Sequence, residues 1–138
     1  MPTGKTSSLE TLYGKVSRYC AYQERSSGEV RQKLRLLGAD AAVAAKLLQR
    51  LREENFVDEE RFARAYVRGK FRINGWGRLK IRNGLRAKGV EEDLIRRVLD
   101  EEINLDEYQS LLCKIVSEKG LRTAISRGFE PGEAYRSC

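Results

Sequence analysis

The sequence contains no histidine, only two prolines and one tryptophan, and no more than three cysteines. Without histidine, a catalytic Cys-His or Ser-His pair is excluded. Cys20, Cys113 and Cys138 are odd in number and widely spaced. This pattern predicts buried or incidental thiols rather than a disulfide framework or a zinc site. We therefore expect no metal and no cofactor.

Long apolar segments are also missing. No run of about 18 apolar residues and no charged-then-apolar leader occurs, so we expect no membrane span, no signal peptide and a cytoplasmic protein. With 41% apolar and 34% charged residues and few aromatics, the composition of the 138 residues favours an all-α fold of thin helical layers. The length allows one ordinary domain or a few small stacked units, and both remain open.

Acidic residues are absent between Arg61 and Gly89. This span carries ten positive charges against +7 for the whole chain, so the flanks together sum to −3. Such local charge predicts a polyanionic partner, either nucleic acid or an acidic protein groove, and a plain solvated surface is the alternative. The candidate binding residues are Arg61, Arg64, Arg68, Lys70, Arg72, Arg78, Lys80, Arg82, Arg86 and Lys88.

Two helices are expected within this basic span. Asp58 is a good N-cap for a helix over 58–73, whose predicted buried stripe is Phe62, Ala65, Tyr66 and Gly69. On a neighbouring line of that helix lie Arg61, Arg64, Arg68 and Arg72. Asn74-Gly75 should end it, and a second helix over 78–88 should present Arg78, Arg82 and Arg86. Two basic ridges would then meet at a bend.

Other helix starts are marked by capping residues. Ser7 with Glu10 and Ser26 with Glu29 are capping-box patterns, and Asp40 should cap a further helix that ends near Glu54. Residues 1–8 are expected to form a flexible tail. Later helices are predicted over 91–102, from Asn104, over 121–127 and from Pro131.

The helical pattern repeats along the chain. An offset of 51 residues places Val30 on Ile81, Leu34 on Leu85 and Gly38 on Gly89. We therefore predict three-helix repeats over 9–54 and 55–102 and a shortened third repeat over 103–138. Such units should stack into an elongated, curved body, with a compact helical bundle as the competing architecture.

The chain resembles the bacterial regulatory protein family RecX over roughly residues 9 to 130. The resemblance is carried by three segments in order: a capped helix with the sequence FVDEERFARAYVR over 56–68, the bend and helix start GWGRLKIR over 75–82, and LRAKGV over 85–90. It implies tandem three-helix repeats that bind the RecA recombinase and its filament on single-stranded DNA. It further implies inhibition of ATP hydrolysis and strand exchange, and so a role in homologous recombination, DNA repair and the SOS response. On this basis we expect a monomeric regulator without enzymatic activity.

Several alternatives remain at this point. A stand-alone DNA-binding or architectural module would use the same arginines on phosphates, and a nuclease is a third possibility. Trp76 could stack on an unpaired base, but a wedge in the bend between helices is favoured. The acidic clusters at 53–54, 91–93 and 101–102 resemble paired carboxylates, although helix-start and solvent roles suit adjacent helical residues better.

Overall fold

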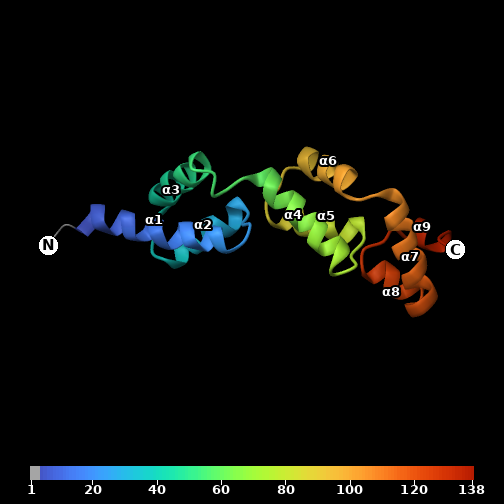
Figure 1. The fold of residues 1–138 in the computed structure, drawn as a ribbon. Helices are drawn as coiled ribbons and strands as arrows, with labels where there is room; N and C mark the ends of the chain where they lie inside the picture. Colours follow the sequence, from blue (N-terminus) through green and yellow to red (C-terminus); the bar gives the residue numbers. More distant parts are fainter. Residues whose placement is uncertain (1–3) are drawn as a thin grey trace. The chain divides into compact units, whose positions relative to one another are not determined.

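The computed structural model describes residues 4–138, with side chains described from residue 9 onward, and no strand occurs in this part of the chain (Figure 1). The all-α, tandem three-helix architecture predicted from the sequence is confirmed. The first repeat contains α1 (Gly4–Tyr22), α2 (Ser27–Leu36) and α3 (Ala41–Glu53). The second contains α4 (Glu59–Arg72), α5 (Arg78–Ala87) and α6 (Glu92–Glu102), and the third α7 (Leu105–Lys119), α8 (Leu121–Ser126) and α9 (Pro131–Tyr135).

The offset of 51 residues holds in the structure. The bounds of α2 and α5 differ by that offset at both ends, and so do the starts of α3 and α6. Val30 and Ile81 are both fully buried, as are Leu34 and Leu85. After each middle helix, an N–H bonds back to a carbonyl five residues earlier, and a glycine with positive φ, at 38, 89 or 128, permits this turn. The elongated stacking of the repeats stays a prediction.

Two compact units divide the chain within α4, one up to Phe62 and one from Ala63 to Cys138. The core of the first unit contains buried residues of α1, α2 and α3 with Val57: Tyr13, Val16, Cys20, Val30, Leu34, Ala44, Leu47, Leu48 and Leu51. In the second unit, Tyr108 packs between two phenylalanines, with ring centroids 5.9 Å from Phe71 and 5.0 Å from Phe129. These three rings join the second and third repeats into one core.

Most predicted helix starts are confirmed, with one exception. The carboxylate of Asp58 accepts a hydrogen bond from the Arg61 N–H at 2.9 Å, and Asp40 caps α3 through the Val43 N–H at the same distance. The capping box predicted at Ser7 is wrong, because α1 already begins at Gly4 and runs through Ser7. Residues 4–8, predicted from the sequence to lie in a flexible tail, are therefore part of helix α1.

The buried face of α4 also differs from the predicted one. Phe62, Ala63, Val67 and Phe71 are buried, whereas Ala65, Tyr66 and Gly69 are only half-buried. The prediction counted Tyr66 as core because both stripes have helical spacing. Instead, the Tyr66 hydroxyl occupies the space where a side chain of residue 84 would lie, so Gly84 allows close approach of α4 and α5.

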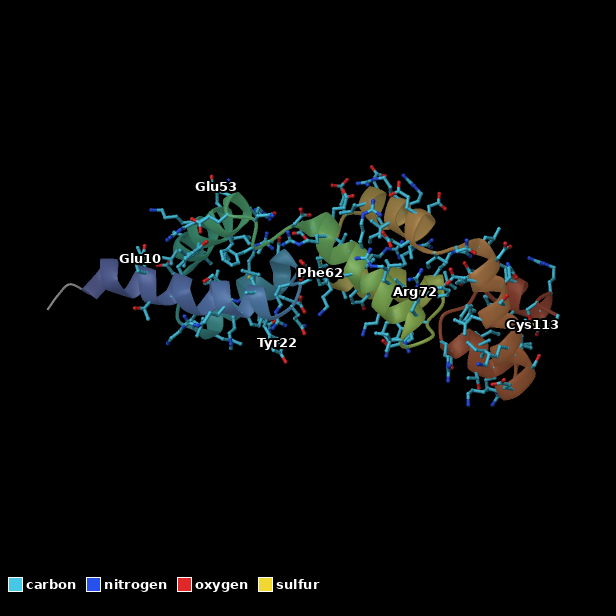
Figure 2. The ribbon with its side chains drawn as sticks, in the orientation of Figure 1. Glu10, Tyr22, Glu53, Phe62, Arg72 and Cys113 are labelled. Carbon is cyan, nitrogen blue, oxygen red and sulfur yellow. A yellow bond between two sulfur atoms is a disulfide. The ribbon has the colours of Figure 1, made fainter. Side chains whose placement is uncertain are left out.

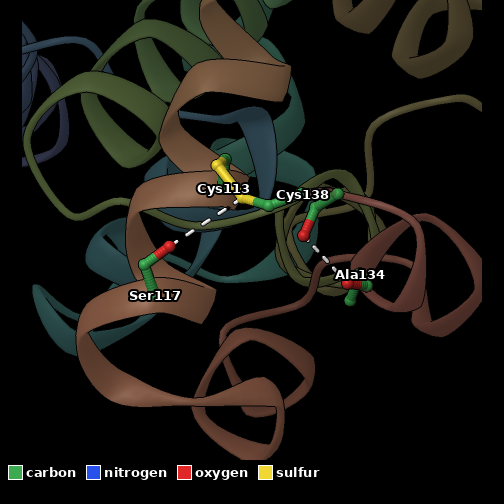
Figure 3. The surroundings of a disulfide bond; sticks show 5 residues. Cys113, Ser117, Ala134 and Cys138 are labelled. Carbon is green, nitrogen blue, oxygen red and sulfur yellow. Dashed lines mark hydrogen bonds between the residues drawn. A yellow bond between two sulfur atoms is a disulfide. The ribbon is translucent and has the colours of Figure 1, made fainter.

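A disulfide joins Cys113 of α7 to Cys138, with the Cα atoms 5.6 Å apart (Figure 3). The prediction that all three cysteines are free thiols is therefore wrong for this pair, because folding of α8 and α9 returns the chain to α7. Nearby, the Ser117 hydroxyl lies 3.8 Å from the Cys138 Sγ, and the Ser137 hydroxyl donates to the Ala134 carbonyl at 2.9 Å (Figure 3). Cys20 is a buried free thiol, and burial raises its pKa to about 11.

Candidate functional site

The arginines of the α4 ridge face carboxylates. Arg64 pairs with Glu101 at 2.5 Å and with Glu102 at 2.8 Å, and Arg68 pairs with Glu102 at 3.1 Å. Arg72, labelled near the end of α4 in Figure 2, lies 4.0 Å from a carboxylate oxygen of Glu107. Although the sequence has no acidic residue between Arg61 and Gly89, carboxylates from α6 and α7 neutralise these arginines in the folded chain.

Glu102 is the centre of this network. Its side chain is 16% exposed and accepts hydrogen bonds from two guanidinium groups. The hydrogen bond from Arg64 is the main cause that lowers the pKa of the Glu102 carboxyl, and Arg68 adds to it while partial burial opposes both. Glu102 therefore stays ionised and orders the middle of the ridge.

Two more of the predicted arginines, Arg61 and Arg86, also form ion pairs with carboxylates. Arg61 pairs with Glu24 at 2.6 Å within the first compact unit. Arg86 pairs with Glu92 and, through this hydrogen bond, lowers the pKa of that carboxyl. In the acidic clusters at 91–93 and 101–102, carboxylates therefore form ion pairs with arginines. No group of three or more His, Cys, Asp or Glu side chains suited to a metal ion occurs among the described residues.

Arg78 is held by the third repeat. Its guanidinium lies 3.1 Å from Glu130, 3.2 Å from Glu133 and 4.0 Å from the centroid of the Tyr108 ring. The Arg78 N–H donates to the Tyr108 hydroxyl at 3.0 Å, and this hydroxyl donates to Glu130 at 2.6 Å. Burial, followed by the bond to Glu130, raises the pKa of Tyr108 well above its usual range. Arg78 thus joins two repeats.

Three predicted cations form no ion pair with a carboxylate within the described side chains: Lys70, Lys80 and Arg82, although the charge of Arg82 helps to lower the pKa of the Glu92 carboxyl. Two of them gather on one aromatic ring. The Nζ atoms of Lys70 and Lys80 lie 4.8 Å and 4.5 Å from the centroid of the Trp76 ring. Unpaired ammonium groups therefore lie beside the half-buried indole, whereas most of the arginines are neutralised.

Arg127 lies beside the turn that carries Trp76, although the two residues are far apart in the sequence. Its Nη1 atom would lie 3.4 Å from a Cβ on Gly75, the residue before Trp76, and it too has no carboxylate partner among the described side chains. We call Lys70, Trp76, Lys80 and Arg127 the Trp76 cluster. Arg127 is not among the site residues predicted from the sequence. Arg127-Gly128-Phe129 follows the third middle helix as Lys88-Gly89-Val90 follows the second, but this pattern does not show what the turn contacts.

The backbone holds the cluster in place. Trp76 donates its N–H to the Lys70 carbonyl at 3.0 Å, and Gly75 provides a left-handed turn with φ of +67°. The Gly77 N–H donates to the Arg127 carbonyl at 2.8 Å. Next to the cluster, a hollow of about 630 Å³ lies between the end of α4 and the start of α7, and its lining includes Gly75 and Arg127 as well as the acidic residues Asp106 and Glu107.

Comparison with known proteins identifies the family. Residues 13–51 match the model for the first three-helix domain of RecX, and residues 58–99 match the model for its second three-helix domain. The chain belongs to the RecX family. The two matches lie within the first two repeats described above, and RecX is a family of regulatory proteins.

Several curated relatives carry the name Regulatory protein RecX. The protein from Geobacillus kaustophilus is 37% identical over 123 residues, which are 88% of this chain and 45% of that protein. The protein from Prosthecochloris aestuarii is 36% identical over 83 residues, 60% of this chain and 55% of that protein. The chain therefore spans about half the length of these curated RecX relatives.

Solved RecX structures share the fold. The crystal structure of RecX from Lactobacillus salivarius aligns with a TM-score of 0.84 at 17% identity, covering 96% of this chain and 95% of that one. Another RecX crystal structure gives a TM-score of 0.80 at 22% identity, covering 93% and 70%. Within the described part of the RecX chain, no helix is both long and apolar enough to span a membrane.

Proposed function

We propose that this RecX-family chain binds the RecA recombinase and its filament on single-stranded DNA and inhibits ATP hydrolysis and strand exchange. Homologous recombination and DNA repair would thereby be modulated. Membership of a regulatory family carries the proposal, through two domain matches in the expected order and relatives named Regulatory protein RecX. The chain would act in the cytoplasm as a monomer with no enzymatic activity of its own.

The distribution of charge supports a polyanionic partner. The second compact unit contains nine of the ten predicted binding residues, all except Arg61. Of these, we assign direct contact first to Lys70 and Lys80, because a cation without an internal carboxylate gains most from an external phosphate. The arginines paired with Glu101, Glu102 and Glu107 would order the helices and contribute to the surrounding potential.

An ATPase assay tests this function. RecA on single-stranded DNA is titrated with the full chain, and we expect the rate of ATP hydrolysis to fall to a plateau, less strongly at high salt. Unchanged hydrolysis at saturating protein would contradict the proposed inhibition. Equal or tighter binding to naked single strands than to RecA-coated strands would instead favour a stand-alone DNA-binding module.

Two matched double variants test whether Lys70 and Lys80 contact the filament directly. A Lys70→Glu, Lys80→Glu double variant should inhibit RecA at least about tenfold less effectively, since two phosphate contacts become repulsive. Lys15→Glu with Lys46→Glu makes the same change in net charge at two exposed lysines of the first unit. Equal loss of inhibition in both double variants would assign the effect to net charge rather than to this surface.

A further inference from the structure

We propose that the Trp76 cluster is a binding site for one base and its flanking phosphates in single-stranded nucleic acid. The indole of Trp76 would stack on the base, and Lys70, Lys80 and Arg127 would contact the phosphates. The inference deepens the proposed function, because it assigns the single strand of the filament to particular residues. It can fail independently, since RecA can be inhibited through protein contacts alone.

The charge of the Trp76 cluster favours an anionic ligand. The two lysine ammonium groups lie 4.8 Å and 4.5 Å from the centre of one ring, and neither has a carboxylate partner among the described side chains. Elsewhere in this unit, arginines with carboxylates in reach form pairs, as Arg64 and Arg78 do. An indole partly compensates an ammonium but does not neutralise it. The cluster therefore favours an anion that the chain itself does not supply.

The ring of Trp76 is partly accessible to a ligand. The core between the second and third repeats is already filled by the rings of Phe71, Tyr108 and Phe129, and Trp76 is not among the buried residues. The wedge role favoured by the sequence stays a prediction, because Trp76 is neither fully buried nor exposed. The accessible part of a partly buried indole between flexible lysines is suited to stacking on a planar ligand once the lysines move to the phosphates. Every base has such a planar face, so the site would not select sequence.

Backbone hydrogen bonds hold the turn that carries Trp76. Trp76 lies between Gly75 and Gly77, and its own N–H and that of Gly77 are bonded to carbonyls of Lys70 and Arg127 at 3.0 Å and 2.8 Å. The turn that carries Arg127 is thereby held against the start of α5. A backbone held in this way places the ring in advance, so little ordering of the turn is required when a ligand binds. An acidic peptide would meet the same charges but would gain nothing from the indole face, so we favour the nucleic acid.

Trp76 is the only tryptophan, so its fluorescence reports on the site directly. The full chain is titrated at low salt with a single-stranded oligothymidylate, without RecA. We expect saturable quenching of the emission, and about tenfold weaker binding without quenching for an abasic strand of equal length. No quenching by oligothymidylate, or equal quenching by the abasic strand or by polyglutamate, would overturn the inference.

Variants locate the contacts. Lys70→Gln with Lys80→Gln should weaken oligothymidylate binding by about tenfold and lower the slope of log affinity against log salt by about 1.4, at about 0.7 for each phosphate contact. The control, Lys15→Gln with Lys46→Gln, removes the same charge in the first unit and should leave both values unchanged. Equal weakening in the two double variants would contradict the site.

The indole is tested separately, with anisotropy of a labelled strand as the readout. Trp76→Ala should lower affinity by about tenfold, and Trp76→Phe should recover part of it because a ring remains. Circular dichroism and thermal unfolding show whether each variant is folded. Wild-type affinity in a folded Trp76→Ala variant would refute stacking. RecA inhibition that persists while the wild-type chain fails to bind the strand would refute this inference and leave the proposed function intact.

Discussion

The first and second repeats of this RecX-family chain have equivalent middle helices that begin in different ways. At the start of α2, Ser26 accepts a hydrogen bond from the Glu29 N–H at 3.1 Å, and the Glu29 carboxylate accepts one from the Ser26 N–H at 2.9 Å. This reciprocal capping box satisfies two N–H groups at the helix start with side chains of the same helix. The first repeat thus caps its middle helix alone.

At the start of α5, the equivalent of Ser26 is Gly77, which has no side chain to form a cap. The third repeat takes that role. Gly77 and Leu79 donate their N–H groups to the carbonyls of Arg127 and Gly128 at 2.8 Å and 2.9 Å. A helix start that lacks its own cap makes the neighbouring repeat part of its fold. This difference explains why the second and third repeats share one compact unit.

The largest expected effect comes from disrupting the contact between the start of α5 and the turn at Arg127 and Gly128. A Cβ on Gly77 would lie 2.5 Å from the backbone of Gly128, so Gly77→Ala should destabilise the second unit by about 3 kcal/mol or more. Denaturant unfolding followed by Trp76 fluorescence measures this. As a control, Gly89→Ala meets no neighbour within 4 Å and should lose only about 1 kcal/mol through its positive φ. Similar losses in both variants would contradict the close approach.

The disulfide is the next largest contribution. It closes a loop of 25 residues that contains α8 and α9, so Cys138→Ser should lower the free energy of unfolding of the second unit by about 3 kcal/mol. The effect should vanish in the presence of a reductant, where the wild-type chain also lacks the bond. A difference of equal size under both conditions would point to lost packing rather than to the cross-link.

Two glycines inside helices of the second repeat, Gly84 and Gly69, should respond in opposite ways to substitution by alanine. Position 33 of α2 is a lysine, whereas its equivalent in α5 is Gly84, whose side-chain space the Tyr66 hydroxyl fills. Gly84→Ala should therefore destabilise by about 1 to 3 kcal/mol. Gly69→Ala, within α4 and free of neighbours within 4 Å, should stabilise by about 1 kcal/mol through helix propensity. Thermal unfolding should show shifts of opposite sign.

Removing the cap of the first repeat should have a smaller effect. Ser26→Ala should cost about 1 kcal/mol, because the Glu29 N–H loses its acceptor on the Ser26 side chain, while the backbone N–H of residue 26 can still donate to Glu29. Hydrogen exchange should locate the loss at the start of α2, with protection in α5 unchanged. Increased exchange in α5 would show that the two helix starts are not independent.

The smallest expected effect is the pH dependence of the stabilisation by Glu102. The folded-state pKa of Glu102 is lowered, so its stabilisation is present above its ordinary value of 4.5 and is lost as pH falls through the folded-state pKa. Glu102→Gln should cost up to about 1 kcal/mol at neutral pH, and the difference from wild type should shrink in acid. A constant difference across this range would contradict the ion pairs with Arg64 and Arg68.

Much of the fold was predictable because its signals are local. Asp40, Asp58 and the Ser26-Glu29 pair mark helix starts by side-chain chemistry that acts within one turn. The offset of 51 residues follows from matching apolar positions such as Val30 and Ile81. The charge of the basic span was also predictable, but its neutralisation was not, because Glu102 and Glu107 reach the α4 ridge from other helices.

By itself, the sequence of this RecX-family chain determined the helices, their order and their repetition, since capping and apolar periodicity act over a few residues. Only the tertiary structure decided which cations remain unpaired, that Arg127 lies beside Gly75 and that Cys113 meets Cys138. The physical reason is range: ion pairs, cross-links and close glycine contacts depend on residues far apart in the chain. Their positions follow only when the helices have packed.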